Sequence, residues 1–193
     1  MDADQRRPRD GRATRELIVT AAARRFAAHA YEATGLRDIA HDVGVDVALV
    51  HRAFGSKERL FVEALAHAMR PASAIETLST GTGAALARRA FEDDPECGAV
   101  ADPLALLVRS VASPGALPLI RDFTATELIA PLAERLKEPG AARAALIAAC
   151  LVGIRLFRDV LEVEALGDGA RPRLEPLIAE LFDDLLTRSI ADV

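Results

Sequence analysis

The stretch that decides the fold runs from Arg15 to Leu65 and reads RELIVTAAARRFAAHAYEATGLRDIAHDVGVDVALVHRAFGSKERLFVEAL. Apolar residues recur in it at three- and four-residue spacing, which is the pattern of amphipathic helices. The first helix is predicted to begin near residue 12, and its apolar pattern fades at His29–Tyr31. We find no segment with the two-residue alternation of a half-buried strand. The stretch therefore predicts helices only.

Start and stop signals for short helices follow at once. Thr34 is expected to cap a second helix, and Gly44 to end it in a tight turn that needs a positive φ. Asp46 is expected to cap a third helix over residues 47–54, which ends at Gly55. Ser56 is expected to cap a fourth helix over residues 57–69. Two short helices joined by a glycine turn and braced by a preceding helix form a helix-turn-helix.

The remainder of the chain is predicted to be helical, with breaks at proline and glycine. We expect helices at residues 84–93, 102–112, 115–137, 140–164 and 173–190. Pro118 and Pro131 lie inside the third of these, so it is expected to be kinked or split. The predicted fold class is all-α with about nine helices. It divides into a flexible arm over residues 1–11, a helix-turn-helix domain over 12–56 and a larger helical body over 57–193.

Charge is unevenly distributed along the chain. The net charge of −5 argues at first against a nucleic-acid partner, because phosphate binding needs positive charge. Residues 1–60, however, hold 11 Lys+Arg and 9 Asp+Glu, a net of +2, while the remaining 133 residues have a net of −7. The mildly basic N-terminal part remains compatible with binding DNA.

The segment from Arg15 to Leu65 closely resembles the DNA-binding domain of the TetR/AcrR family of transcriptional repressors. The matching motifs are the Ala-Ala-x-x-x-Phe of the first helix, Tyr31-Glu32-Ala33-Thr34, Arg37-Asp38-Ile39-Ala40, Gly44-Val45 and Phe54-Gly55-Ser56-Lys57-Glu58-x-Leu60-Phe61. Residues 104–109 and the helix around 141–161 are similar to one type of ligand-binding C-terminal domain in that family. The chain departs from the family pattern at four positions in the reading region: Ala30, Leu49, His51 and Ala53.

The resemblance implies that the helix over residues 47–54 lies in the major groove of DNA. Val47 and Ala48 are then candidates to contact thymine methyl groups, and His51 or Arg52 to donate to a base or a phosphate. Arg37 matches a family position that reaches into the groove.

Two further positions look like phosphate anchors. Thr34 and Lys57 each lie at a helix N-terminus, where exposed N–H groups and the helix dipole favour anions. Additional contacts to phosphate or to the minor groove are expected from the N-terminal arginines Arg6, Arg7, Arg9, Arg12 and Arg15.

The resemblance also implies a homodimer that binds a double-stranded DNA operator, and a small apolar or amphipathic ligand bound within residues 57–193. Candidate ligand contacts are Leu106, Phe123, Glu127, Arg155 and Phe157, with Phe91 beside them. Stripes on the last two helices are candidates for the dimer contact: Ala144, Ile147, Ala148, Leu151, Val152 and Arg155 on one, and Leu177, Leu181 and Leu185 on the other. The implied function is a repressor that an inducer releases from a palindromic operator.

Other classes of function find little support. Gly81-Thr82-Gly83 follows no predicted strand and lacks the Lys-Ser/Thr of a phosphate loop, and the histidines show no zinc-ligand spacing. We therefore predict no catalytic, metal or cofactor site. With neither a secretory signal nor an uncharged stretch of membrane-spanning length, a cytoplasmic location is expected. One alternative stays open, a helix-turn-helix regulator without a small-molecule inducer, controlled by a protein partner or by its own concentration.

Overall fold

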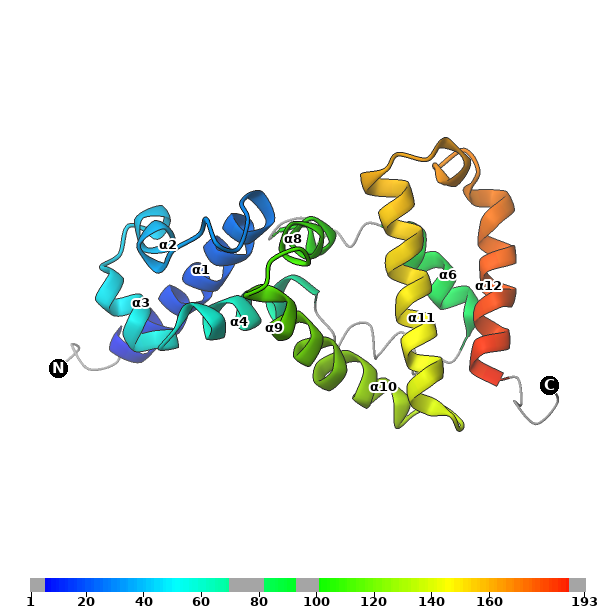
Figure 1. The fold of residues 1–193 in the computed structure, drawn as a ribbon, viewed down its shortest axis with the longest axis horizontal. Helices are drawn as coiled ribbons and strands as arrows, with labels where there is room; N and C mark the ends of the chain where they lie inside the picture. The colour runs from blue at the N-terminus through cyan, green and yellow to red at the C-terminus, as the bar shows by residue number, and fades with distance from the viewer. Residues whose placement is uncertain (1–5, 70–81, 93–100, 188–193) are drawn as a thin grey trace. The chain divides into compact units, whose positions relative to one another are not determined.

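The computed structural model describes residues 6–69, 82–92 and 101–187, with side chains from residue 11 onward. All regular structure in these ranges is helical, which confirms the all-α prediction (Figure 1). The chain separates into two compact units. The first comprises residues 1–69 and 95–121, and the second comprises residues 70–94 and 122–193.

The first unit is built around helix α1. Its elements are α1 (Arg6–Ala28), α2 (Leu36–Val43), α3 (Val47–Phe54), α4 (Lys57–Met69) and α8 (Pro103–Ser110). Helix α1 packs against α2, α4 and α8, and α3 packs against α2 and α4. An aromatic cluster lies at the centre: Phe26 and Phe61 meet edge to face with ring centroids 5.0 Å apart, and Tyr31 stacks on Phe26 at 5.8 Å. The helix-turn-helix is thereby held on a rigid support.

Local chemistry sets the bounds of the two short helices as the sequence predicts. Gly44 ends α2 with φ 75°, a conformation that other residues rarely adopt. The Asp46 carboxylate accepts a hydrogen bond from the Ala48 N–H at 2.6 Å and so caps α3. Ser56 caps α4 in the same way, since its hydroxyl oxygen accepts from the Arg59 N–H at 3.3 Å.

The start of α2 differs from the prediction. The capping residue is Gly35, and the Asp38 carboxylate reaches back to accept its N–H at 2.8 Å. Thr34 is buried instead, and its hydroxyl donates to the Ala30 carbonyl at 3.3 Å. The prediction that Thr34 caps α2 is therefore wrong, because its hydroxyl is drawn into the turn that precedes the helix.

Helix α1 also begins earlier than its apolar pattern indicates. It starts at Arg6, within the expected flexible arm, whereas residues 1–5 of that arm lie outside the described residues. Pro8 falls in the first turn, where the missing N–H has no intrahelical partner to lose.

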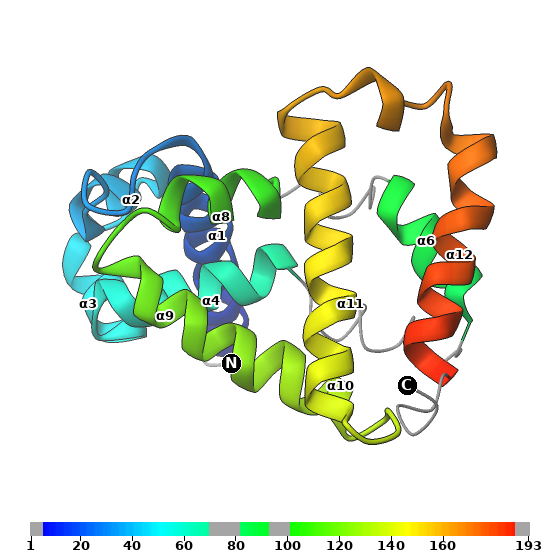
Figure 2. The same cartoon turned by 45° about the vertical axis from the view of Figure 1, so that its right-hand side comes forward.

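The second unit is a set of helices packed around α6. It contains α6 (Gly83–Phe91), α11 (Gly140–Arg155) and α12 (Arg171–Thr187), together with the π-helix η1 (Thr124–Ile129), α10 (Ala130–Ala133), the π-helix η2 (Leu156–Val160) and the 3₁₀-helix η3 (Glu164–Leu166). Helix α6 lies against both α12 and α11, as two views agree (Figures 1 and 2). Its core includes Leu86, Phe91, Leu132, Ile147 and Phe182.

The predicted helix over residues 115–137 is one continuous helical run with a widened turn. Helix α9 (Ala116–Phe123) continues into η1, where the Ala130 N–H donates to the Ala125 carbonyl five residues back. Pro131 follows directly, and its ring lacks the N–H and collides with the carbonyl four residues earlier. The widened turn accommodates this collision, so the predicted distortion at Pro131 takes the form of a π turn.

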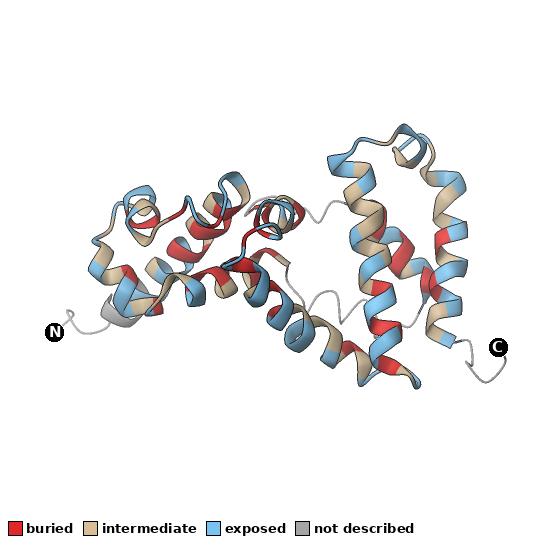
Figure 3. Cartoon of the chain, viewed as in Figure 1, coloured by how far each residue is buried: buried red, intermediate tan, exposed pale blue. Residues whose placement is uncertain are grey.

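The stretch Gly140–Val160 is apolar around most of its circumference, and only 22% of its most apolar 18-residue segment is buried. Its length and composition alone also suit a membrane span, a test that core helices pass as well. Ala144 and Ile147 face the core of the second unit, whereas Leu146, Val152 and Phe157 are exposed (Figure 3). The predicted dimer stripe is thus wrong at Ala144 and Ile147, which are buried within the protomer. A helix that is apolar all round does not reveal from its sequence which side faces the core.

Candidate nucleic-acid interface

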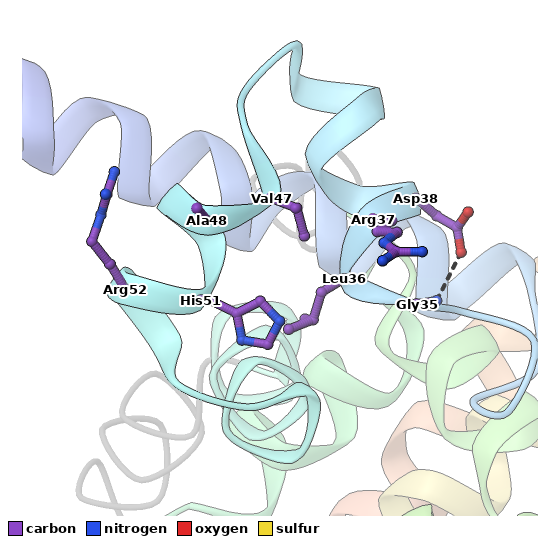
Figure 4. A pocket seen from close by; sticks show the side chains of 8 residues that line it. All are labelled: Gly35, Leu36, Arg37, Asp38, Val47, Ala48, His51 and Arg52. Carbon is purple, nitrogen blue, oxygen red and sulfur yellow. Dashed lines mark hydrogen bonds between the residues drawn. The ribbon is translucent and has the colours of Figure 1, made fainter.

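A concavity lies on the surface of the first unit, where the first turn of α2 meets the outer face of α3 (Figure 4). Its lining residues are Gly35, Leu36, Arg37, Asp38, Val47, Ala48, His51 and Arg52. Five of the seven predicted DNA-binding residues are therefore neighbours on one surface. The two helices contribute both arginines, the imidazole and the small apolar side chains to this surface.

Helix α3 has two distinct faces that explain this arrangement. Val50 and Phe54 are buried against the rest of the unit. Ala48, His51 and Arg52 lie on the outer face and are exposed. A helix with a packed inner face and a short, polar outer face can enter a major groove without disturbing the domain core.

Lys57 lies outside the concavity, at the first position of α4. Its Nζ stands 4.0 Å from the centroid of the Tyr31 ring, in a cation–π contact. Burial lowers the pKa of Lys57, while the neighbouring carboxylates of Glu32, Glu58 and Asp38 act in the opposite direction. The ammonium group is thus held by its surroundings at a helix N-terminus, the position expected of a phosphate anchor.

Two other predicted DNA contacts are occupied within the protein. Thr34 is 1% exposed and does not line the concavity. Arg15 pairs with Glu63 at 2.6 Å and lies 4.6 Å from the centroid of the Phe54 ring, so it braces the end of α3. The side chains of Arg6, Arg7 and Arg9 lie outside the described residues.

An ion-pair network that the sequence reasoning missed holds α2 against α1. The Arg25 guanidinium donates to both carboxylate oxygens of Asp42, at 2.9 and 2.7 Å, and lies 3.7 Å from Asp38. Asp38 in turn accepts the Gly35 N–H that begins α2. The network therefore orients the helix that carries Arg37. Arg25 and Asp42 are separated by 17 residues, so no local spacing indicates that they meet.

A second missed contact joins the turn before α2 to the start of α9. The Ser113 hydroxyl donates to the Glu32 carboxylate and accepts the Ala116 N–H at 3.0 Å. The hydrogen bond from Ser113 lowers the pKa of Glu32, and the Gly115 N–H acts in the same direction. Gly115 approaches Tyr31 closely, because a Cβ there would lie 3.0 Å from Cε1 of Tyr31 and the ring would have to give by a few tenths of an ångström.

Tyr31 lies beside this contact and is tied to α4 as well. Its hydroxyl donates to the Glu58 carboxylate at 3.5 Å. Burial, followed by the charge of Glu58, raises the pKa of Tyr31 to about 12. The phenol therefore stays protonated near neutral pH, and its ring remains a suitable partner for the Lys57 ammonium.

The predicted ligand-contacting residues do not share one environment. Leu106 is buried in the first unit, whereas Arg155 and Phe157 belong to the second. Phe123 is buried, but Glu127 and Phe157 are exposed. Phe91 contributes to the core of the second unit. A ligand site formed by these residues stays a prediction.

Comparisons with known proteins agree with this geometry. The model of the bacterial regulatory proteins of the tetR family matches residues 18–64. The model of the tetracyclin repressor-like C-terminal domain matches residues 81–186, more than half of the chain. None of the curated proteins compared with this chain matches it.

Two solved structures resemble the chain over most of its length. A TetR-family regulator from Streptomyces coelicolor A3 is 26% identical, covers 90% of this chain and 94% of its own, and superposes with a TM-score of 0.65. Another structure, described as the molecular basis for control of antibiotic production by bacterial hormones, is 25% identical over 86% of this chain and 95% of its own, with a TM-score of 0.47.

Proposed function

The chain belongs to the TetR family of bacterial regulatory proteins and is a DNA-binding transcriptional regulator, and on this premise we propose that it is a homodimeric cytoplasmic repressor. A small apolar or amphipathic inducer releases it from a palindromic operator. The observation that carries the proposal is the gathering of Arg37, Val47, Ala48, His51 and Arg52 around one concavity on a helix-turn-helix. Residues 12–56 bind DNA in this proposal, and residues 57–193 bind the ligand and the second protomer.

The DNA interface is tested by separating phosphate contacts from base contacts. Lys57→Ala should weaken binding to all sequences and reduce the salt slope by about one per protomer, because a phosphate contact releases a counterion. Arg37→Ala should instead relax sequence preference and weaken operator binding by about 1–3 kcal/mol, as expected of a base contact. Arg109→Ala is the matched control, since Arg109 is exposed on α8 outside the concavity.

These measurements use operator titrations at several salt concentrations. Unchanged operator affinity and salt slope in the Lys57 and Arg37 double variant would show that the DNA site is elsewhere. If Arg109→Ala lost as much operator affinity as the Lys57 and Arg37 variants, the effect would come from the loss of positive charge in general and not from a specific contact.

Dimerisation is supported by large apolar side chains exposed on the second unit. Leu146, Val152 and Phe157 on α11 and η2, and Leu177 and Leu181 on α12, are large apolar side chains left exposed. An exposed apolar surface of this kind marks a site of protein association. A dimer that reads two half-sites in successive major grooves needs its recognition helices about 34 Å apart, one turn of DNA.

Sedimentation at micromolar concentration tests the dimer. Phe157→Asp should convert the protein to a monomer, because the charge would have to be buried in the contact. Leu17→Asp is the control, since Leu17 is 60% exposed on α1 of the first unit, whereas the proposed contact is formed by residues of the second. A monomeric wild type, or equal dissociation in both variants, would contradict the model.

Induction is tested by titrating the protein–operator complex with a panel of metabolites. An inducer must bind the DNA-incompetent conformation more tightly than the DNA-binding one. The larger this difference in inducer affinity, the more the inducer should weaken operator binding. Release by at least one compound supports a ligand-controlled repressor. Release by none of them favours a regulator controlled by a protein partner or by concentration.

A further inference from the structure

His51 and Gly55 are joined by two hydrogen bonds across the end of α3. The Gly55 N–H donates to the His51 carbonyl at 2.8 Å, which closes the last turn of the helix. The His51 ring faces the Gly55 carbonyl in return, with Nδ1 and the oxygen 3.4 Å apart. Gly55 has φ 78°, a conformation that suits glycine, and this aims its carbonyl at the ring.

This contact determines which ring nitrogen carries the proton. A carbonyl oxygen only accepts hydrogen bonds, so Nδ1 must be the donor. In a neutral imidazole one nitrogen donates and the other accepts. Nε2 is therefore left as an acceptor, on a side chain that is exposed and lines the concavity between α2 and α3 (Figure 4).

We propose that neutral His51 reads an exocyclic amino group in the major groove, through acceptance of its N–H by Nε2. This proposal rests on the DNA-binding role of the concavity proposed above. Only two groups in the major groove donate hydrogen bonds, the N4 amino group of cytosine and the N6 amino group of adenine. His51 thus selects C or A at one operator position.

The neighbours of His51 bring other groups to the concavity. Arg37 of α2 and Arg52 of α3 supply donors, and the Asp38 carboxylate, also an acceptor, accepts the Gly35 N–H at the start of α2. Arg59 of α4 approaches Gly55 from the other side, with Nη1 3.7 Å from the place of a Gly55 Cβ. The arginines can read guanine or phosphate but have no acceptor.

A substitution can remove the acceptor. The side-chain amide of His51→Asn can still donate to the Gly55 carbonyl, but it has no atom at the place of Nε2.

The experiment starts from duplexes enriched by the full chain from a random library near about pH 8. In the best duplex, single adenines are replaced by purine and single cytosines by 2-pyrimidinone, each of which removes one amino group. At one position per half-site the wild type should lose about fivefold in affinity, the value of one hydrogen bond. His51→Asn should lose nothing further there.

Three outcomes overturn the inference in distinguishable ways. If the wild type and His51→Asn respond identically at every replaced position, His51 reads no amino group. If replacing guanine by 7-deazaguanine selectively hurts the wild type, His51 is a donor and the tautomer is reversed. If no duplex is enriched at all, the proposed DNA-binding function itself fails. Equal circular dichroism and unfolding midpoints for both proteins establish that His51→Asn folds.

Discussion

The Arg25–Asp42 pair provides a sharp test of how the reading helices are positioned. Arg25→Ala removes the ion pair between α1 and α2, in which Nη1 of Arg25 donates to both carboxylate oxygens of Asp42. It also leaves the carboxylates of Asp38 and Asp42 unneutralised one helical turn apart, where like charges repel. We therefore expect the variant to loosen α2 and displace Arg37, which that helix carries.

The magnitude follows from the geometry and exposure of the pair. Two unit charges about 4 Å apart attract by about 4 kcal/mol at an effective dielectric constant of about 20, before desolvation is subtracted. The side chain of Arg25 is 24% exposed and that of Asp42 is 36% exposed, so the pair lies between surface and buried cases. We expect a coupling energy of about 1.5 kcal/mol, above the surface range of about 0–1 kcal/mol.

A double-mutant cycle with Arg25→Ala and Asp42→Ala isolates this energy, measured by urea unfolding at constant ionic strength. Arg12→Ala is the matched control, because its pair with Glu16 is 85% and 63% exposed and should contribute under about 0.5 kcal/mol. In parallel, Arg25→Ala should weaken operator binding, whereas Arg109→Ala, on the exposed side of α8 outside the concavity, should change it much less.

Two results would refute this reasoning. A coupling energy no larger than that of the Arg12–Glu16 pair would mean that solvent screens the Arg25–Asp42 contact fully. Normal operator affinity in a destabilised Arg25→Ala variant would mean that other contacts orient α2, and that the network serves stability alone.

Three further predictions concern the rest of the chain. Gly83→Ala should destabilise the second unit by about 2 kcal/mol or more in urea unfolding, because its Cβ would lie 2.0 Å from the Ala179 carbonyl oxygen. An unchanged unfolding midpoint would show that α6 and α12 do not approach so closely at this position. The pKa of Glu32 is lowered chiefly by Ser113, so its stabilisation is present above the usual carboxyl pKa of about 4.3 and lost as pH falls through the lowered value. Glu32→Gln should therefore flatten the acid side of the stability–pH curve, and a curve identical to wild type would contradict the contact. Phe182→Ala should lower the unfolding free energy by about 3–5 kcal/mol, since the ring is fully buried; a loss under about 1 kcal/mol would place it outside the core.

The helix-turn-helix was predictable because its signals are local. The caps at Asp46 and Ser56 and the positive φ at Gly44 arise within a few residues of one another, and each is confirmed. The exposed side of α3 was equally readable, because burying Val50 and Phe54 directs the other positions outward. The grouping of five predicted DNA-binding residues at one concavity follows from these local rules.

What only the tertiary structure decided depends on contacts between distant segments. Arg25 meets Asp42 where α1 packs on α2, and Glu32 meets Ser113 where the turn before α2 contacts the start of α9; no periodicity encodes either pairing. The sequence by itself determined the all-α class and the reading helix, since capping and helical periodicity act over one or two turns. Which side of the apolar α11 faces the core was settled by packing, because a helix that is apolar all round can be buried in more than one orientation.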